Sequence, residues 1–514
     1  MTGRFERSKL EIPAVPVVLL LIVTSGKFIF NYWYYLKYDW DTVRDIVLPL
    51  ALNLPVKTNP YAFLLPEIMK SLAGLVSKEV WLILLVAAAN ACYLFSGVIL
   101  FHLGFKLTRN RPAALLAAGF FLSSYCLVYS SSFLDDNVFQ ITLTLGSLAA
   151  LGFERPSPAR VALSGLLFAL AGCFHFQTLA LWPAYCFLTA RLSGTGSGRR
   201  IKTVLWWAAF SLFSYLALLV LFGLHDSLFA FLLRPAQYPE AASLARGESR
   251  FLLLLQGAAA SLIPSPVSIG PLLKQSILGR LALVAVNGGV LAVLLLALRQ
   301  AWTVRKAEPE KSAYLGFALI AFACAALFAL AVEPDGTERW LNAAPFLGLI
   351  LAVLSGRTFF LDSFQRRPGF LMAGTALLFL LVINSAFLGK IAALVLQPGP
   401  YQFLTRPTLQ RLANDYAGRT VYLPYGFEMV SFFRPSRTCY VDDSIKDDLV
   451  SQCYSTGKVE GGKLHLHESD VLVYEALVDG AGFKDLRKKS IVSLERTGLL
   501  GHSMKFLVKS PNKL

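Results

Sequence analysis

Four charged residues crowd together just after the first hydrophobic stretch of this sequence. Residues 38–60 read YDWDTVRDIVLPLALNLPVKTNP and contain Asp39, Asp41, Arg44 and Asp45. A carboxylate held at a membrane surface is costly unless it works or is paired, and its pKa can rise there toward neutrality. Such a group can act as a general base toward a hydroxyl. The alternative is a solvated helix start, where acids complement the helix dipole, but this explains one acid better than three.

A second acidic pair, Asp135 and Asp136, opens a short apolar run after the segment SSYCLVYSSSFL. Capping of a helix N-terminus is the structural alternative for this pair. The neighbouring apolar runs are short, so we expect Asp136 to lie at the same depth as Asp41. This common depth favours a shared chemical role.

His175 lies between two short apolar runs in GCFHFQTLALWP. A single histidine in apolar surroundings is often structural. We expect this one to share the depth of Asp41 and Asp136, where it could orient a phosphate or an acceptor, or ligate a divalent ion.

The segment EPDGTERWLNAAPF places Glu338 and Arg339 before another apolar run. Arg339 could pair with Glu338, or bind a lipid phosphate through a charge-assisted fork. Outer loops supply further candidates for phosphate binding, which are Lys57, Arg234, Arg246, Arg250 and Lys274.

The composition requires a membrane-embedded scaffold to hold these residues. Of 514 residues, 55% are hydrophobic and 16% are charged, a balance typical of polytopic α-helical membrane proteins. Residues 12–35 follow Arg4, Arg7 and Lys9 and predict an uncleaved first helix. Hydropathy predicts about 11 transmembrane helices in all. The others are residues 80–103, 112–132, 138–153, 160–174, 176–192, 203–224, 278–298, 313–332, 341–356 and 370–393.

If successive spans cross the membrane in opposite directions, the loops on the two sides differ in the sign of their charge. The short loops on one side are basic, so the positive-inside rule makes that side cytoplasmic, together with the N-terminus. The cytoplasmic cations are Lys106, Arg109, Arg111, Arg191, Arg199, Arg200, Lys202, Arg299, Arg305, Lys306, Arg357, Arg366 and Arg367. The opposite side receives a first outer loop, 36–79, and a long outer loop, 225–276. It also receives Asp39, Asp41, Asp45, Asp135, Asp136, His175, Glu333, Asp335 and Glu338.

Residues 1–393 are therefore expected to form a transmembrane domain, and residues 394–514 a small extracytoplasmic α/β domain. In the second region, β-like segments are expected at 420–423, 438–441, 471–474, 491–494 and 505–508, with helical patterns at 444–453 and 477–488. Cys439 and Cys453 could form a disulfide there if the region lies outside the cytoplasm.

Several function classes are excluded or disfavoured. The net charge of +16 is carried by short loops beside lipid rather than by a continuous basic stripe, so nucleic acid is not an expected partner. No nucleotide-binding loop or nucleophile elbow occurs. If the acids lie outside the cytoplasm, an activated substrate has to arrive on a lipid carrier.

The sequence resembles the integral-membrane glycosyltransferases of the GT-C class, in the branch similar to protein O-mannosyltransferases and aminoarabinose transferases. Four motifs carry the resemblance, in an order that covers nearly the whole membrane part. They are DTVRD at 41–45, SSYCLVYSSSFLDDNVF at 123–139, FHFQTLALWP at 174–183 and ERWLNAAPFLGLILA at 338–352.

The resemblance implies an inverting transfer of a sugar from a polyprenyl-phosphate donor to a hydroxyl of a glycolipid, polysaccharide or protein, at the periplasmic face of a bacterial inner membrane. By position Asp41 would be the base, assisted by Asp39 or Asp136, and Lys57 and Arg339 would hold the phosphate. The family's commoner first loop has adjacent acids, whereas Trp40 separates Asp39 from Asp41 here. Which of the two is the base therefore stays open.

Other readings remain open at this point. Arg44, Asp135, His175, Glu338 and Arg250 complete the expected substrate-binding set. No cofactor is required, although Asp41, Asp136 and His175 could bind a divalent cation such as Mg²⁺ or Mn²⁺. The alternative functions are a transporter or flippase for a lipid-linked saccharide and a non-catalytic partner in glycan assembly. A transporter would be expected to carry its ionisable groups near the midplane instead.

Overall fold

The structure of the protein is a computed structural model. It describes residues 64–132, 136–152, 155–194, 196–222, 249–263, 277–332, 334 and 336–358, together with positions 382, 386 and 414 and the strand segments 420–424, 437–442, 450–455, 458–463, 471–473, 491–497 and 503–509.

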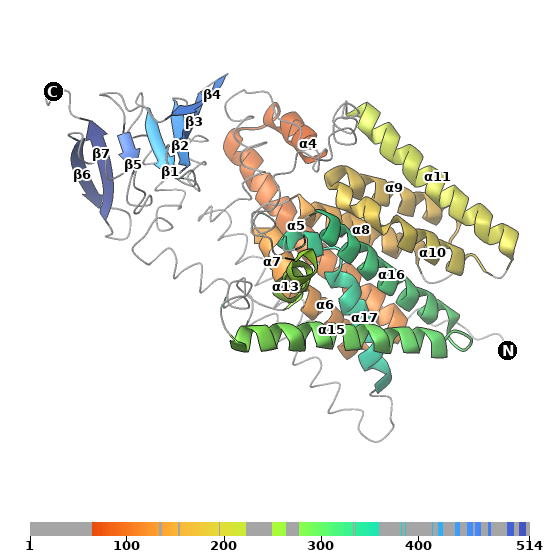
Figure 1. Ribbon diagram of the computed structural model, residues 1–514. Helices are drawn as coiled ribbons and strands as arrows, with labels where there is room; N and C mark the ends of the chain where they lie inside the picture. The colour runs from red at the N-terminus through yellow and green to blue at the C-terminus, as the bar shows by residue number, and fades with distance from the viewer. Residues whose placement is uncertain are drawn as a thin grey trace.

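The first part of the chain is a bundle of helices (Figure 1). They are α4 (Leu64–Ala73), α5 (Lys78–Thr108), α6 (Arg111–Ser123), α7 (Tyr125–Ser132), α8 (Asn137–Leu151), α9 (Pro158–Phe174), η2 (Phe176–Leu181), α10 (Trp182–Leu192), α11 (Ser197–Leu221), α13 (Arg250–Leu262), α15 (Ile277–Thr303), α16 (Pro309–Val332), η4 (Thr337–Trp340) and α17 (Ala344–Thr358).

Each predicted span from 80–103 to 341–356 is largely helical, but Ser124 has an extended backbone and divides the span 112–132 into α6 and α7. Among the described residues, 5 helical segments are long and apolar enough to cross a membrane by themselves, namely Val80–Thr108, Ser197–Leu221, Ile277–Thr303, Pro309–Val332 and Thr337–Gly356. The predicted spans 12–35 and 370–393 lie outside the described residues, so the total of about 11 stays a prediction.

Short polar residues fix where several helices begin. The side chains of Ser77, Asn110 and Ser157 accept hydrogen bonds from the backbone N–H groups three residues further on, at the starts of α5, α6 and α9. Each cap satisfies a backbone donor that has no partner inside its own helix. A polar residue in front of an apolar run therefore defines the helix start.

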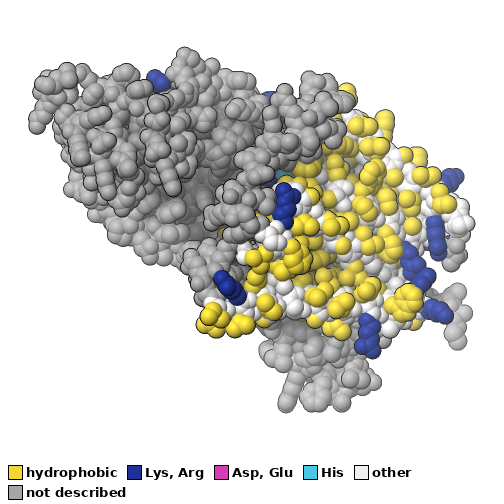
Figure 2. Space-filling model, in the orientation of Figure 1, with side chains coloured by type: hydrophobic (Ala, Val, Ile, Leu, Met, Phe, Trp, Pro, Cys, Tyr) yellow, Lys and Arg dark blue, Asp and Glu magenta, His cyan; other side chains and the backbone are white. Residues whose placement is uncertain are grey.

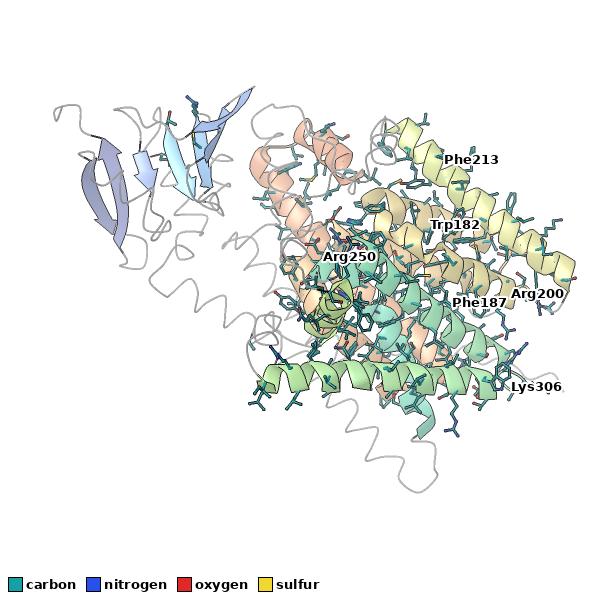
Figure 3. The ribbon with its side chains drawn as sticks, in the orientation of Figure 1. Trp182, Phe187, Arg200, Phe213, Arg250 and Lys306 are labelled. Atoms are coloured by element: carbon teal, nitrogen blue, oxygen red, sulfur yellow. The ribbon has the colours of Figure 1, made fainter. Side chains whose placement is uncertain are left out.

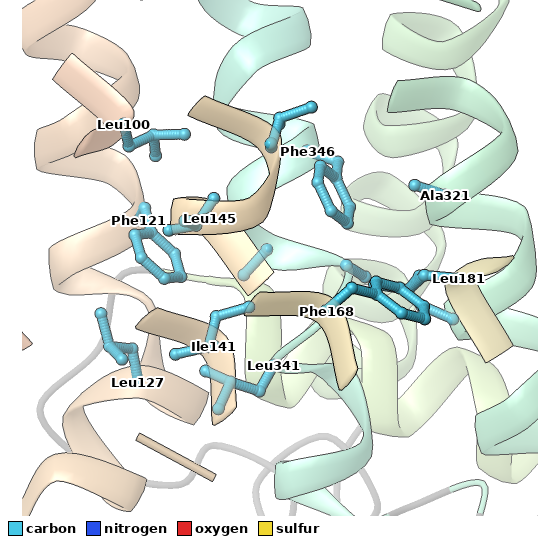
Figure 4. Packing of buried hydrophobic residues seen from close by; sticks show 14 of the residues in the cluster. Leu100, Phe121, Leu127, Ile141, Leu145, Phe168, Leu181, Ala321, Leu341 and Phe346 are labelled. Atoms are coloured by element: carbon cyan, nitrogen blue, oxygen red, sulfur yellow. The ribbon is translucent and has the colours of Figure 1, made fainter. Parts of the chain in front are cut away.

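Aromatic rings from five helices form the centre of the bundle. Tyr185 of α10 stacks on Trp207 of α11 at a centroid distance of 5.3 Å and meets the edge of Phe168 of α9 at 4.8 Å. Phe317 of α16 links Tyr185 to Phe346 of α17, at 5.2 and 5.3 Å. Figure 4 shows Phe168 and Phe346 among the surrounding aliphatic side chains. This core fixes the ends of α9, α10, α16 and α17 relative to one another.

Close helix contacts depend on glycine. A Cβ at Gly348 of α17 would lie 3.0 Å from the backbone oxygen of Ala117 in α6, and one at Gly104 of α5 would lie 3.2 Å from the Cα of Ala114. Small residues at such crossings let backbones approach closely, which is how helices pack when lipid surrounds them.

We predict that Gly348→Leu destabilises the protein by about 1–3 kcal/mol, because the obstructing atom belongs to the backbone and cannot rotate away. Gly289→Leu is the matched control, since nothing lies within 4 Å of a Cβ at Gly289 of α15. Thermal unfolding of the purified proteins in detergent measures the difference. Equal midpoints for the two variants would contradict close packing of α17 on α6.

The two ends of the bundle differ in charge. Arg191, Arg200 and Arg305 lie near the junctions α10–α11 and α15–α16 at one end, whereas His175 and Arg339 lie at the opposite ends of α9 and α16. Figure 2 shows a broad hydrophobic surface bordered on one side by a row of Lys and Arg side chains. The 24 residues of α16 separate the ends by about 36 Å, enough to cross the hydrocarbon core of a bilayer.

The later part of the chain contains a seven-stranded mixed sheet in the order β4-β3-β2-β1-β5-β7-β6. β1 is parallel to β2 and β5, and all other neighbours are antiparallel. The strands are β1 (Val421–Pro424), β2 (Thr438–Asp442), β3 (Val450–Ser455), β4 (Lys458–Lys463), β5 (Val471–Val473), β6 (Ile491–Thr497) and β7 (Ser503–Lys509).

All five expected β segments are strands, but residues 450–453 belong to β3 and not to a helix. The helical pattern at 444–453 was misleading because β3 is fixed by pairing with β2 and β4 on its two sides. The predicted helix at 477–488 lies outside the described residues, so the α/β character of this region stays a prediction.

Cys439 of β2 is disulfide-bonded. The register of β2 and β3 places it directly opposite Cys453, the other cysteine that the sequence singled out. The five cysteines of the described helices are free thiols, namely Cys92, Cys126, Cys173, Cys186 and Cys324.

Candidate functional site

Asp136 occupies the N-cap position of α8, but its side chain makes no capping hydrogen bond. Its carboxylate is only 7% exposed, and its Oδ1 accepts a hydrogen bond of 3.3 Å from Nδ2 of Asn137. Capping therefore does not account for this acid. A buried carboxylate at a helix start lies where the helix dipole favours negative charge, and such a group is a candidate for chemistry.

A stripe of polar side chains continues along α8 from this point. Asn137, Gln140, Thr144 and Ser147 follow one another at intervals of three or four residues, so they lie on one face of the helix. All four are buried. In a bilayer such a face has to point into the bundle, where its polar atoms find partners.

Amide groups connect this stripe to two other elements. Nε2 of Gln140 donates to Oγ1 of Thr178 in η2 at 2.6 Å and to Oδ1 of Asn342, just before α17, at 2.8 Å. Nε2 of Gln177 donates to Oδ1 of Asn137, and also to Oε1 of Gln140 at 3.2 Å. We call Asn137, Gln140, Gln177, Thr178 and Asn342 the amide network. It joins α8, η2 and the start of α17 close to Asp136.

His175 ends α9 and begins η2, beside this network. Its Nδ1 accepts a hydrogen bond of 3.2 Å from the backbone N–H of Gln177, and its Nε2 lies 3.3 Å from Nη1 of Arg339. Both contacts present a donor to the ring, and a neutral imidazole has one acceptor nitrogen, so only one of them is a full hydrogen bond at a time.

The charge state of His175 follows from its surroundings. Complete burial and the Arg339 guanidinium hold the pKa of His175 well below its ordinary value. The imidazole is therefore neutral at neutral pH, which leaves Arg339 as the cation of this pair.

The short helix η4 positions Arg339. Trp340 is buried at its end, and its Nε1 donates to the backbone oxygen of Pro334 at 3.3 Å. The guanidinium of Arg339 is 11% exposed and lies 3.8 Å from the Glu338 carboxylate. An arginine in this setting can bind a phosphate strongly, because little water competes for its N–H groups.

The structure thus brings together four of the residues selected from the sequence. A chain of contacts runs from Asp136 through Asn137 and Gln177 to His175 and then to Arg339 and Glu338. The common depth of Asp136 and His175 in the membrane stays a prediction.

Of the other residues selected for the site, Arg250 alone is among the described ones. Arg250 is exposed at the start of α13, a helix that packs against η4 and α7, and Figure 3 shows it at the end of the bundle away from Arg200 and Lys306. Asp39, Asp41, Arg44, Lys57 and Asp135 lie outside the described residues, as do Glu333 and Asp335.

The metal set of Asp41, Asp136 and His175 stays a prediction, because Asp41 lies outside the described residues. On His175, Nδ1 accepts a hydrogen bond from a backbone N–H group and Nε2 lies beside a guanidinium. Among the described residues, no group of three acidic, His or Cys side chains has the arrangement of a metal site.

Reasoning from the sequence missed the amide network. The signal was present, because the polar residues Asn137, Gln140, Thr144 and Ser147 interrupt an apolar run at helical spacing. The partners Gln177 and Asn342 lie next to His175 and Arg339 in the sequence, within two of the motifs already selected.

Among known proteins, similarity to this chain is found only with solved structures. No family model matches the chain, and no curated protein matches it. Among solved structures, the oligosaccharyltransferase of Archaeoglobus fulgidus in the apo form has a TM-score of 0.43 at 11% identity, covering 81% of this chain and 63% of that one. AglB of the same organism, in complex with an inhibitory peptide and a dolichol-phosphate, gives 0.43 at 12% identity with the same coverage.

A third similar structure is the arabinofuranosyltransferase AftD from Mycobacteria, with a TM-score of 0.39 at 15% identity, covering 80% of this chain and 30% of that one. All three are sugar-transferring enzymes by name, the kind of enzyme that the sequence motifs resemble. Because the TM-scores are below 0.5, the functional assignment rests on the residues of the site.

We predict that Asp136→Asn changes stability little, because an asparagine oxygen can still accept the hydrogen bond from Asn137 and no capping bond is lost, and that it lowers activity because the negative charge is removed. Ser157→Ala is the control, since Ser157 does cap α9 and its loss should cost about 1 kcal/mol. Thermal unfolding and the amount of product made by each variant measure the two effects. A large loss of stability in Asp136→Asn would assign this acid to structure instead.

Proposed function

We propose that this protein is a membrane glycosyltransferase that moves a sugar from a polyprenyl-phosphate carrier to a hydroxyl acceptor at the extracytoplasmic face of a bacterial inner membrane. The observation that carries the proposal is the half-buried Arg339, held beside neutral His175 and connected through hydrogen-bonded amides to the buried Asp136. A cation and an acid at one end of a membrane bundle suit a reaction that releases a lipid phosphate.

Arg339 is proposed to stabilise the leaving group. When the bond between the sugar and the phosphate breaks, negative charge grows on the phosphate oxygens, and a fixed guanidinium offsets it most where water is scarce. The neutral imidazole of His175 and the Glu338 carboxylate both lie beside Nη1 of Arg339, at 3.3 and 3.8 Å. These neighbours hold the guanidinium in place without adding positive charge.

A carboxylate is proposed to activate the acceptor. The acceptor oxygen forms a bond to the anomeric carbon, the bond from that carbon to the phosphate oxygen breaks, and the hydroxyl proton passes to the carboxylate. Asp41 is the proposed base, with Asp39 or Asp136 assisting. This single displacement inverts the anomeric centre and needs no covalent enzyme intermediate. Arg44, Lys57, Asp135 and Arg250 are proposed to contact the donor or the acceptor.

The amide network is proposed to position these groups. Its members are buried and bonded to one another across α8, η2 and the start of α17. A shift of η2 would therefore move His175, and a shift at Asn342 would move Arg339. The network links Arg339, which is proposed to contact the phosphate, to Asp136.

We predict that Asp41→Asn and Arg339→Gln each reduce glycan transfer by about 100-fold or more, because each removes a group whose charge matters most in the transition state. The measurement is mass spectrometry of envelope glycans and glycoproteins from a strain lacking the gene, complemented with each variant. Arg299→Gln, which removes an exposed cation at the other end of the bundle, is the control and should restore the glycan fully.

Other outcomes would point elsewhere. Unchanged glycans in the deletion strain would refute the proposal. Full activity of Asp41→Asn would remove that residue as the base. Flux of a lipid-linked saccharide across proteoliposomes, without any glycosylated product, would favour a transporter or flippase.

The region after residue 394 is proposed to lie outside the cytoplasm, since disulfides persist in oxidising compartments. We predict that the denatured wild-type protein, of its 7 cysteines, presents only the 5 helical ones to a maleimide before reduction, and all of them afterwards. Cys439→Ala should give equal labelling before and after reduction. Complete labelling of the wild type before reduction would contradict this location.

A further inference from the structure

A large basic cleft lies at the end of the bundle away from His175. Its volume is about 1020 Å³, and its walls come from the α8–α9 link, the end of α10, the start of α11, the end of α15 and the start of α16. The charged residues that line it are Arg155, Arg191, Arg200, Arg305, Lys306 and Glu310. We call this the basic cleft.

The charges of the basic cleft are unbalanced. Among the described lining residues, five cations face one carboxylate, Glu310, and none of the five makes an ion pair with another described residue. The nearby Glu308 is already paired with Lys311, at 3.1 Å. Like charges gathered in one cleft repel each other, so an anion that enters it is held by several of them at once.

The arrangement is built by the backbone and is not a chance gathering of surface side chains. Gly194 has a φ of +99°, and a Cβ there would lie 3.3 Å from Nε of Arg155. Nε of Arg200 donates to the backbone oxygen of the same residue. The missing side chain at Gly194 therefore leaves room for the Arg155 guanidinium, and its backbone oxygen holds that of Arg200. On the opposite wall, Arg305 lies 5.7 Å above the ring of Trp302.

A second cleft of about 870 Å³ adjoins the first and shares Arg155 with it. Its lining includes the apolar side chains of Ile201, Leu205 and Trp206 on α11, which are 60%, 62% and 51% exposed. Exposed apolar residues on a membrane helix face lipid chains, and tryptophan is typical of the level of the headgroups. An apolar surface therefore runs directly beside the basic cleft.

We propose that the basic cleft binds the headgroup of a membrane lipid that carries two phosphates, with the acyl chains lying along the α11 surface. A single phosphate would leave most of the five cations unmatched and most of the volume unfilled. Basic pockets between helices on the cytoplasmic side are the kind of site that holds such headgroups. The apolar cleft alongside favours a lipid over a soluble polyphosphate, which presents the same phosphate chemistry. This proposal is independent of the reaction at Arg339.

The test uses the purified full-length protein in detergent and native mass spectrometry, with cardiolipin, phosphatidylglycerol and inorganic tripolyphosphate as separate probes. We predict tightest binding of cardiolipin, and a loss of about tenfold or more in Arg191→Gln/Arg200→Gln, because each removed cation weakens attraction to an anionic headgroup. Arg305→Gln/Lys306→Gln, on the opposite wall, should give a similar loss and covers the case in which the first variant folds poorly. Arg299→Gln is the matched control, because Arg299 is an exposed cation of α15 that does not line the cleft.

Three results would overturn the proposal. Equal binding of cardiolipin and phosphatidylglycerol would remove the requirement for two phosphates. Equal losses in Arg299→Gln and in the cleft variants would reduce the effect to general surface charge. Binding of tripolyphosphate that cardiolipin does not displace would assign the cleft to a soluble anion.

Discussion

Polar groups inside a bilayer have no water to bond with, and this constraint organises the helical part of the protein. The stripe on α8 starts at Asn137 and runs through Gln140 and Thr144. Its amides find partners only if η2 and the segment around Asn342 pack on that face. Interhelical bonds of this kind contribute about 0.6–2 kcal/mol each, but an unpaired amide would cost more. The network thus fixes which elements surround Asp136, His175 and Arg339.

The two ends of these helices differ in their charged residues. α9 and α10 have Arg155 and Arg191 near one end and His175 at the other, while α16 extends from the basic cleft toward η4. The cations of the basic cleft and the residues around His175 are therefore separated along the helix axes. Among the described residues, one end has the five cations of the basic cleft, and the other has the half-buried guanidinium of Arg339 beside an acid, an imidazole and amides. This asymmetry gives the molecule an orientation before any substrate is bound.

The sequence predicted the helices well, because apolar runs bounded by caps such as Ser77 and Ser157 leave little choice in lipid. It also brought Asp136, His175 and Arg339 to the same end from hydropathy and threading alone. It could not predict that Arg339 would lie next to His175, because that contact depends on how η4 packs through Trp340. It likewise missed β3, where pairing with two neighbouring strands overrides the local pattern. The sequence alone predicted the chemical roles of individual residues, but it did not predict contacts between segments that are distant in the chain.

The short length of α8 has a consequence for the membrane around it. Its 15 residues extend about 22 Å, less than the roughly 30 Å of a bilayer's hydrocarbon core. Gly152, at the end of α8, is tied to Tyr314 near the start of α16. Both ends of α8 are buried in the bundle, Asp136 at one and Gly152 at the other. The longer helices around α8 therefore make the contact with lipid, and the acid at its start is surrounded by protein.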